Sequence, residues 1–550
     1  MTHPTSIRAA VSPATIGKAT RFFSGTIVDI INETFQNARR AGATLIQVEL
    51  DESRKPAILS IRDNGRGIAD PIDFVTLGQS SWEAGTYDED PAGMGAFSLS
   101  SSTSTITSRT QSTDGWRATI TPDAWQAKAD IAVENAPEAD IGTTIELEMT
   151  IEWTLRVDHA VRNAARYCPV HVVLNGQACP QSDWFASAIY RKAMSGYEIG
   201  IVESRDETTP NINFHGLTLR AQLPSVSEIN GKTYRAIIDM HHAGGLELVL
   251  PARKEVIQND AFRQLCKEAK LAIYEAIARQ PEHFLSFNDW NTAAALGVEM
   301  QHAKASLNLW SPPTAQCNSD DIGGLVTIGS EHTIVPQLEP AIGIPFNHAM
   351  HDHPMRASFV AEERAFEGYP WYDAISRIDN IEFEIVADGI HTLRTESSPS
   401  SNLDASIKAD RITLHFDRVT NGEATTHAVP SPIAFLTETY DTSNADEVVV
   451  AWSTADKIEA NIFAALLEDA YFDPSHDCDA DSFETQLESF RRDAMSHAVR
   501  LLEGDDAATC NQLRQILLSQ LWMLPQDRAI TITIHNREIA VGISPPEPKT

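Results

Sequence analysis

The sequence predicts an α+β protein, and three features of the chain support this fold class. The first 150 residues alternate helical and strand-like patterns, and the next segment contains strand-like runs followed by one long helical pattern. The C-terminal part mixes alternating apolar runs with helices. Because 550 residues exceed the size of one hydrophobic core, we expect several domains. We place their boundaries at 1–150, 151–295, a Pro/Gly/His-rich connecting region at 296–375, and 376–550.

The composition is that of an ordinary globular protein, with 42% hydrophobic and 22% charged residues. Acidic residues outnumber basic ones 76 to 43, which gives a formal net charge of -33. Such a chain repels a phosphate backbone, so nucleic-acid binding is disfavoured. A basic groove assembled from distant residues would not be visible in the sequence, so a DNA-processing role stays open.

Nothing in the sequence indicates export or a membrane. The six cysteines are scattered without paired spacing, and no apolar run reaches membrane-spanning length. The N-terminus lacks the apolar core of a signal peptide. We therefore expect a soluble, cytoplasmic protein with no membrane partner.

The segment TIVDIINETFQNARRA (26–41) places apolar residues at helical spacing, and Gly42 follows where helices commonly stop. Glu33 and Asn37 lie four residues apart, so they share one face of this predicted helix. Taken alone, such a pair is more often two solvated side chains.

Two short strands, TLIQVEL (44–50) and AILSIRD (57–63), are predicted next. The second ends in Asp63 and continues into Gly65 and Gly67, which alone would indicate a tight turn. A polar stretch, the glycine-rich segment PAGMGAFS and the strand-like IGTTIELEM follow in that order.

In this order the motifs resemble those of the GHKL ATPases. This superfamily unites gyrase-type topoisomerases, ninety-kilodalton heat-shock chaperones, MutL mismatch-repair proteins and histidine kinases. The resemblance covers about residues 20–150, and the layout looks closest to the chaperones. It implies a Bergerat-type α/β sandwich that binds ATP and Mg²⁺.

The resemblance also implies roles for the first motifs, each with a physical reason. A buried Asp63 carboxylate accepts the amine of adenine, which guanine's carbonyl would oppose, while Gly65 and Gly67 let the backbone approach the base. Asn37 offers a neutral oxygen to Mg²⁺, and Glu33 orients and deprotonates the attacking water.

The later motifs complete the expected nucleotide site. Gly93 and Gly95 let backbone N–H groups point at phosphates, and Ser98 is expected to open the next helix. Residues 78–90 are long and polar enough for a mobile lid. Thr143 matches the threonine that reaches the adenine-binding aspartate through water.

One position departs from the pattern of many superfamily members, because Arg40 stands where an aspartate is usual. The magnesium and water roles remain intact, but the resemblance does not extend to the finer nucleotide contacts that the aspartate makes. Arg39 and Arg40 could form a solvated face or pair with the lid.

The middle of the chain resembles the second, transducer-like domain of the chaperone and topoisomerase members. A hairpin at 167–177 looks like the strand that opens that domain, and a helix over 260–280 follows further strands. In LVLPARKEVIQND, Arg253 is the candidate cation for the γ-phosphate and Lys254 the alternative. A surface arginine at a helix start remains the competing interpretation.

The C-terminal half carries no family motif. His348, His351 and His353 could ligate zinc, but a loop with hydrogen-bonded histidines is the favoured interpretation. Helices are predicted at 455–472, 481–502 and 510–524, the second with Asp481 and Glu484 as a capping pair, and a hairpin at 529–543.

The sequence as a whole indicates an ATP-driven conformational machine with a protein client or partner subunit. Its output would be chaperone-like remodelling or a switch in a mobile-element or defence system, and an ATP-dependent homodimer fits this layout. A nucleotide-sensing scaffold with negligible hydrolysis and a MutL- or topoisomerase-like DNA-processing ATPase are the alternatives.

Overall fold

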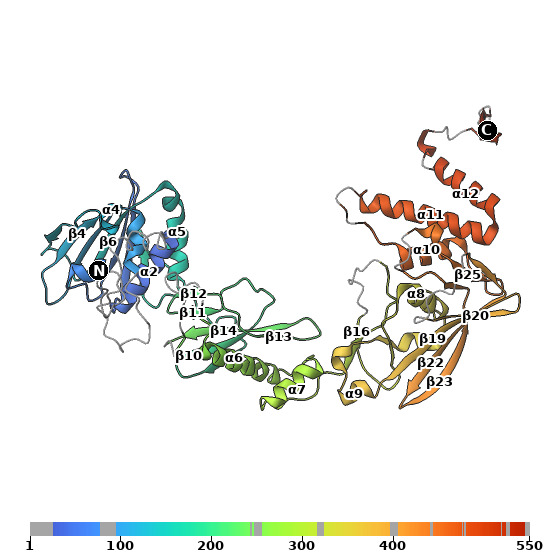
Figure 1. Cartoon of the computed structure of the whole chain (residues 1–550), viewed down its shortest axis with the longest axis horizontal. Helices are drawn as coiled ribbons and strands as arrows, with labels where there is room; N and C mark the ends of the chain where they lie inside the picture. The colour runs from blue at the N-terminus through green and yellow to red at the C-terminus, as the bar shows by residue number, and fades with distance from the viewer. Residues whose placement is uncertain are drawn as a thin grey trace, which may run out of the picture. The chain divides into compact units, whose positions relative to one another are not determined.

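The computed structural model confirms the α+β class and divides the chain into two compact units, Met1–Ala303 and Lys304–Thr550 (Figure 1). Each unit has its own buried cores. The structure describes residues 26–76, 95–241, 245–246, 256–315, 324–395, 405–439, 444–475, 477, 480–518, 520–523 and 528–544.

The first unit begins with an eight-stranded sheet that extends beyond residue 150. Strictly alternating buried positions in several of these strands give the sheet one apolar face. In spatial order the strands are β5 (Val133–Asn135), β4 (Trp116–Ile120), β3 (Ser104–Arg109), β6 (Gly142–Glu148), β2 (Ile58–Asp63), β1 (Leu45–Asp51), β7 (His171–Leu174) and β8 (Gln177–Ala178).

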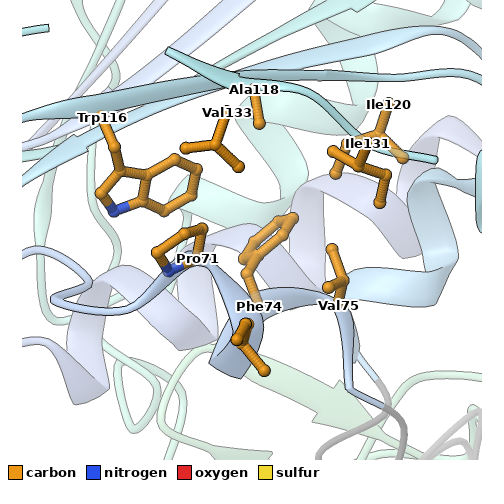
Figure 2. A pocket seen from close by; sticks show the side chains of 9 residues that line it. Pro71, Phe74, Val75, Trp116, Ala118, Ile120, Ile131 and Val133 are labelled. Atoms are coloured by element: carbon orange, nitrogen blue, oxygen red, sulfur yellow. The ribbon is translucent and has the colours of Figure 1, made fainter. Parts of the chain in front are cut away.

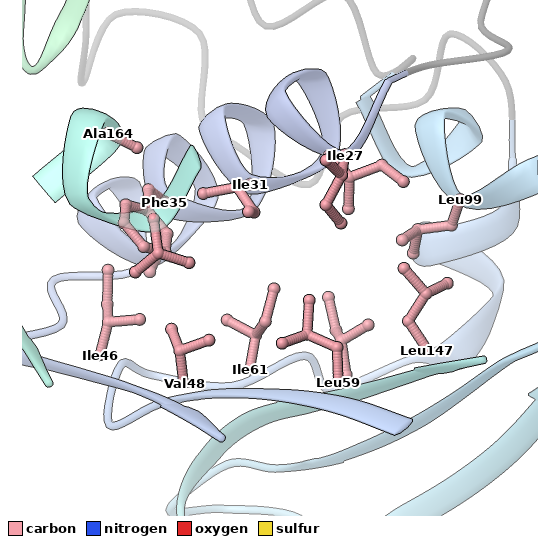
Figure 3. Close-up of a cluster of buried hydrophobic side chains, with 14 of the residues drawn as sticks. Ile27, Ile31, Phe35, Ile46, Val48, Leu59, Ile61, Leu99, Leu147 and Ala164 are labelled. Atoms are coloured by element: carbon pink, nitrogen blue, oxygen red, sulfur yellow. The ribbon is translucent and has the colours of Figure 1, made fainter. Parts of the chain in front are cut away.

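Helix α2 (Ile27–Arg40) packs on this apolar face, together with α5 (Ile151–Ala165) and the 3₁₀ helix η2 (Gly95–Ser101). Figure 3 shows Ile27, Ile31 and Phe35 pointing from α2 towards the side chains of β1 and β2. The predicted helix at 26–41 and the predicted strands at 44–50 and 57–63 are therefore confirmed.

The hairpin predicted at 167–177 forms, but the expectation that it opens the second domain is wrong. Strand β7 pairs in parallel with β1, so the hairpin extends the first sheet. Its two apolar residues Val172 and Leu174 are buried in the first core. This pairing joins segments more than 120 positions apart, and no local sequence pattern reports it.

The second sheet of this unit carries the predicted helix, α6 (Asp260–Ala278), on one face, followed by α7 (Phe287–Ala295). Helix α6 presents buried apolar residues to β10, β13 and β14. The strands run in the order β12 (Leu217–Leu219), β11 (Ile212–Phe214), β14 (Thr233–Met240), β10 (Tyr197–Glu203) and β9 (Tyr190–Ala193), and β13 (Ser225–Ser227) also pairs with β14.

The second unit is built on a mixed sheet and a small three-stranded sheet. The first contains β18 (Phe359–Ala361), β17 (Thr333–Val335), β19 (Ser376–Ala387), β22 (Arg411–Thr420), β23 (Glu423–Pro430) and β20 (Ile390–Thr395). The second contains β21 (Ile407–Ala409), β25 (Val450–Ser453) and β24 (Ile433–Phe435). Strands β15 (Ser306–Asn308) and β16 (Leu325–Thr327) form a separate pair.

Helices α8 (Pro340–Ala349), α10 (Ala460–Tyr471), α11 (Phe483–Glu503) and α12 (Asp505–Leu518) follow, and β26 (Ile530–His535) pairs with β27 (Glu538–Ile543). The C-terminal hairpin and three helices in the predicted order are thus confirmed, but α10 begins five residues after the predicted start and α12 spans Asp505–Leu518 instead of 510–524. The expected capping pair is wrong, because Ser482 caps α11 by accepting a hydrogen bond from the Thr485 N–H.

The three clustered histidines lie near the end of α8. His348 is in the last turn of that helix, His351 follows it, and His353 caps a short 3₁₀ helix, η3 (Pro354–Ser358), by accepting from the Met355 N–H. Within the described residues, no group of three His, Cys, Asp or Glu side chains is arranged to hold a metal ion.

Candidate functional site

Helix α2 places Glu33, Asn37 and Arg40 on the same face. The helix begins with a capping box in which Thr26 and Asp29 satisfy each other's backbone N–H groups. It ends before Gly42, whose φ of +73° suits a residue without a side chain. Ile27, Ile31 and Phe35 fix the helix to the sheet, so the two predicted catalytic and magnesium positions are held by a rigid element.

Asp63 lies at the end of β2, paired on one side with Ile46 of β1 and on the other with Thr143 of β6. Its Oδ1 atom accepts a hydrogen bond from the Gly65 N–H at 2.8 Å, and the Thr143 N–H also donates to the carboxylate. Burial raises the pKa of Asp63 to about 6, because desolvation outweighs these two hydrogen bonds. The predicted adenine-binding carboxylate is therefore adjacent to the predicted Thr143.

Two glycines beside Asp63 are required by the close approach of backbone segments. Gly67 has a φ of +74°, and a Cβ there would lie 2.1 Å from the Arg109 carbonyl oxygen. Gly142 has a φ of +121°, and its Cβ would lie 2.1 Å from the Asp63 carbonyl oxygen. Any side chain at either position would push apart the strands that hold Asp63.

The loop after Asp63 is also fixed to the end of α2. The Arg66 N–H donates to the Ala41 carbonyl at 2.9 Å, and Gly65 is buried against Ala41. The Asn64 side chain accepts from the N–H groups of Thr44 and Leu45 at 2.9 and 3.0 Å. The carboxylate motif and the Glu33–Asn37 helix consequently form one connected structure.

Ser108 on β3 is a site residue that the sequence analysis missed. Its fully buried hydroxyl donates to the Gly142 carbonyl at 2.9 Å and accepts from the Ile68 N–H at 2.9 Å. The same oxygen lies 3.0 Å from the Thr143 hydroxyl. Ser108 thus ties together the segments on both sides of Asp63, and its only sequence signal is a serine at an inward position of a strand.

Gln36 is a second residue that the sequence did not single out. Its buried side chain donates from Nε2 to the His215 carbonyl oxygen at 2.9 Å, in the turn between β11 and β12. His215 and Gly216 both have positive φ, and a Cβ on Gly216 would lie 2.7 Å from the Cα of Cys168. This contact joins the Glu33–Asn37 helix to the second sheet of the same unit.

Arg40 is buried, which contradicts a solvated face at this position. The residue is 5% exposed, and its Nη1 donates to the Asn37 Oδ1 atom at 3.2 Å. The same nitrogen lies 3.8 Å from the Glu33 Oε1 atom. The guanidinium group therefore contacts both predicted functional side chains of α2.

The expected phosphate-binding segment is only partly described. Gly95 begins η2, and Ser98 lies inside this 3₁₀ helix instead of opening it. Gly93 and the expected lid at 78–90 lie outside the described residues, as do both candidate cations, Arg253 and Lys254.

An apolar pocket lies between the short helix α3 (Pro71–Val75), which follows the Asp63 loop, and the outer strands of the first sheet (Figure 2). The Trp116 indole N–H donates to the Ile68 carbonyl at 2.8 Å at its edge. The lining contains none of the predicted site residues and no charged side chain, which fits neither phosphate nor metal binding; it comprises Pro71, Ile72, Phe74, Val75, Trp116, Ala118, Ile120, Ile131 and Val133.

Comparison with known proteins places this site in a family. The family model described as "Histidine kinase-, DNA gyrase B-, and HSP90-like ATPase" matches residues 24–151. This segment therefore belongs to the GHKL ATPase superfamily, as the motifs predicted. The description covers kinases, gyrase and chaperones alike, so the chaperone-like layout stays a prediction.

The remaining comparisons add little. A structural match is the crystal structure of the ATPase region of Saccharomyces cerevisiae topoisomerase II, at 12% identity and a TM-score of 0.32, covering 41% of this chain and 76% of that chain. A search of curated proteins found no match. Among the described residues, no helix is both long enough and apolar enough to cross a membrane.

Proposed function

We propose that the N-terminal domain binds ATP with Mg²⁺ and hydrolyses it, and that the chain is an ATP-driven conformational machine. The observation that carries this proposal is the half-buried Asp63 carboxylate, held beside Thr143 and fixed to the end of the helix that bears Glu33 and Asn37. The match of residues 24–151 to the ATPase family model supports the same activity.

Asp63 supplies the selectivity for adenine. Its ionised carboxylate only accepts hydrogen bonds, so it binds the exocyclic amine of adenine and repels the carbonyl oxygen of guanine. Thr143, adjacent to it, would hold a water between the base and the carboxylate. Gly65 and Gly67 leave the loop without side chains where the base would approach.

Glu33 and Asn37 supply the hydrolytic chemistry. The amide oxygen of Asn37 is a hard, neutral donor of the kind that Mg²⁺ prefers, so the residues present fit the ion. A Mg²⁺ ion held there would neutralise charge on the phosphates. Glu33 accepts a proton from water as the water oxygen attacks the γ-phosphorus and the bond to the β-phosphate oxygen breaks, releasing ADP.

The remaining site residues follow from the resemblance. The backbone at Gly93 and Gly95 would bind phosphate oxygens, and Ser98 lies in the 3₁₀ helix that Gly95 begins. Arg253, with Lys254 as the alternative, would sense the γ-phosphate from the second domain. When this cation contacts the γ-phosphate, the ATP-binding domain and the second domain of the first unit would change their relative positions.

The Gln36–His215 hydrogen bond supports a conformational change driven by hydrolysis, because it joins α2, the helix that carries Glu33 and Asn37, to the second sheet. We propose a cytoplasmic protein that acts on a protein client or partner subunit, as a chaperone-like or switch ATPase, and ATP-dependent homodimerisation would fit such a cycle.

The test is Mg²⁺-dependent ATP hydrolysis by the wild type, by Glu33→Gln and by Glu49→Gln, with nucleotide binding measured in parallel. Glu33→Gln should bind ATP and lose at least about a hundredfold in turnover, since it lacks the general base. Glu49→Gln removes the same charge from an exposed position of β1 and should behave as the wild type. Binding without turnover in the wild type would favour a nucleotide-sensing scaffold, and turnover that requires DNA would favour a DNA-processing ATPase.

A further inference from the structure

Arg40 is the feature of the site that the proposed reaction does not use. Arginine is seldom fully buried unless it is paired, because its charge must leave water. Here the side chain of Arg40 is 4% exposed and lies against two partners on its own helix, the Asn37 amide oxygen at 3.2 Å and the Glu33 carboxylate at 3.8 Å. These are the two groups on which metal binding and water activation depend.

The Arg40 contact competes with a metal ion. Mg²⁺ would bind the Asn37 Oδ1 atom directly, whereas in the structure that atom already accepts a hydrogen bond from a guanidinium group. Two cations sharing one oxygen repel each other, so bound metal and the observed position of Arg40 oppose each other.

A nucleotide changes this balance. A triphosphate brings several negative charges into the site, and guanidinium groups bind phosphate oxygens well because their N–H groups match the geometry of the anion. The Arg40 side chain can then exchange the Asn37 oxygen for phosphate oxygens without losing an anionic partner.

We propose that Arg40 is a positioning residue that holds Glu33 and Asn37 in the nucleotide-free chain and moves to the phosphates when nucleotide binds. Mg²⁺ can therefore occupy Asn37 only together with a nucleotide. This inference rests on the proposed ATP-binding function and adds a role for a position at which the sequence departs from the superfamily pattern.

The test measures how strongly Mg²⁺ assists nucleotide binding to the full-length protein. The dissociation constant of the non-hydrolysable analogue AMP-PNP is measured calorimetrically, once with EDTA and once with excess MgCl₂. The dissociation constant with EDTA, divided by the dissociation constant with MgCl₂, gives the factor by which the metal strengthens nucleotide binding. The variants are Arg40→Gln, Arg40→Lys and, as a matched control, Arg39→Gln, which removes the same charge from a side chain that donates to Gln36 at 3.3 Å.

The proposal predicts that Arg40→Gln raises this ratio about tenfold relative to the wild type. Without metal, the variant lacks a cation for the phosphates and binds more weakly; with metal, the competitor for Asn37 is gone. Arg40→Lys retains a charge and should keep a ratio near that of the wild type, as should Arg39→Gln.

If Arg40 has a purely structural role, Arg40→Gln raises both dissociation constants by the same factor and leaves their ratio unchanged. That result would overturn the proposal. Arg40→Lys keeps the test decisive if Arg40→Gln fails to fold. A lysine variant whose ratio rises about tenfold, although it keeps the positive charge, would also contradict the proposal. Failure of the folded wild type to bind AMP-PNP under either condition would instead reject the proposed function itself.

Discussion

Asp63 is a largely desolvated carboxylate that accepts two backbone hydrogen bonds. Its surroundings raise its pKa to about 6, mainly by desolvation, although two backbone N–H groups favour its charged form. An adenine amine would add a further donor to the carboxylate, and this stabilises the ionised form. Binding of the base and loss of the proton are therefore linked.

This linkage predicts a pH dependence of ATP binding. Below about pH 6 Asp63 takes up a proton that adenine binding must displace, so the dissociation constant should rise by up to about tenfold for each further pH unit. Above that pH the carboxylate is already ionised, and its contribution should be constant. Calorimetric titrations between pH 5 and pH 8 would show this.

Asp63→Asn is the matched control for the pH experiment. It cannot ionise but still offers an oxygen to the amine, whereas protonation of the nucleotide phosphates affects both proteins equally. The difference between the two pH profiles isolates Asp63. Parallel profiles for wild type and variant would contradict the assignment of Asp63 to the base.

At the scale of elements, the sequence predicted what local patterns determine. Apolar spacing identified α2, and alternation followed by Asp-x-Gly-x-Gly identified β2 and the loop after it. Contacts between distant segments were missed, because Ser108 lies 40 positions from Ile68 and Gln36 lies 179 positions from His215. The burial of Arg40 was missed for a different reason, because a charged residue at a helix end is usually solvated.

Strand β3 offers a matched pair of serines that tests the contact made by Ser108. Ser108→Ala removes the partner of the partly buried Ile68 N–H and of the buried Gly142 carbonyl, so we expect the free energy of unfolding to fall by about 1–3 kcal/mol. ATP binding should weaken as well, because these segments hold Asp63. Denaturant titration and calorimetry measure the two effects.

Ser104→Ala is the control on the same strand. Ser104 is equally buried, but its hydroxyl has no hydrogen-bond partner within the described part of the chain. Its replacement should change the free energy of unfolding by less than about 0.5 kcal/mol. Equal losses for both variants would mean that the Ser108 hydrogen bonds contribute nothing of their own.

At the scale of the whole molecule, the chain consists of two compact units, and the predicted site residues that the structure describes all lie in the first. The motifs predicted the family to which residues 24–151 belong, because nucleotide chemistry demands particular residues in a fixed order. The second unit has well-packed cores built from Phe346, Phe383, Phe416 and Phe463 among others, but core packing carries no information about a client.

The most direct test of the account is calorimetric titration of the full-length chain with Mg²⁺·ATP and with Mg²⁺·GTP at pH 8. The account predicts one saturable ATP site per chain, GTP binding at least about tenfold weaker because its carbonyl opposes the Asp63 carboxylate, and loss of ATP binding in Asp63→Ala. A folded wild type that takes up no ATP, or that binds ATP and GTP equally with or without Asp63, would contradict it.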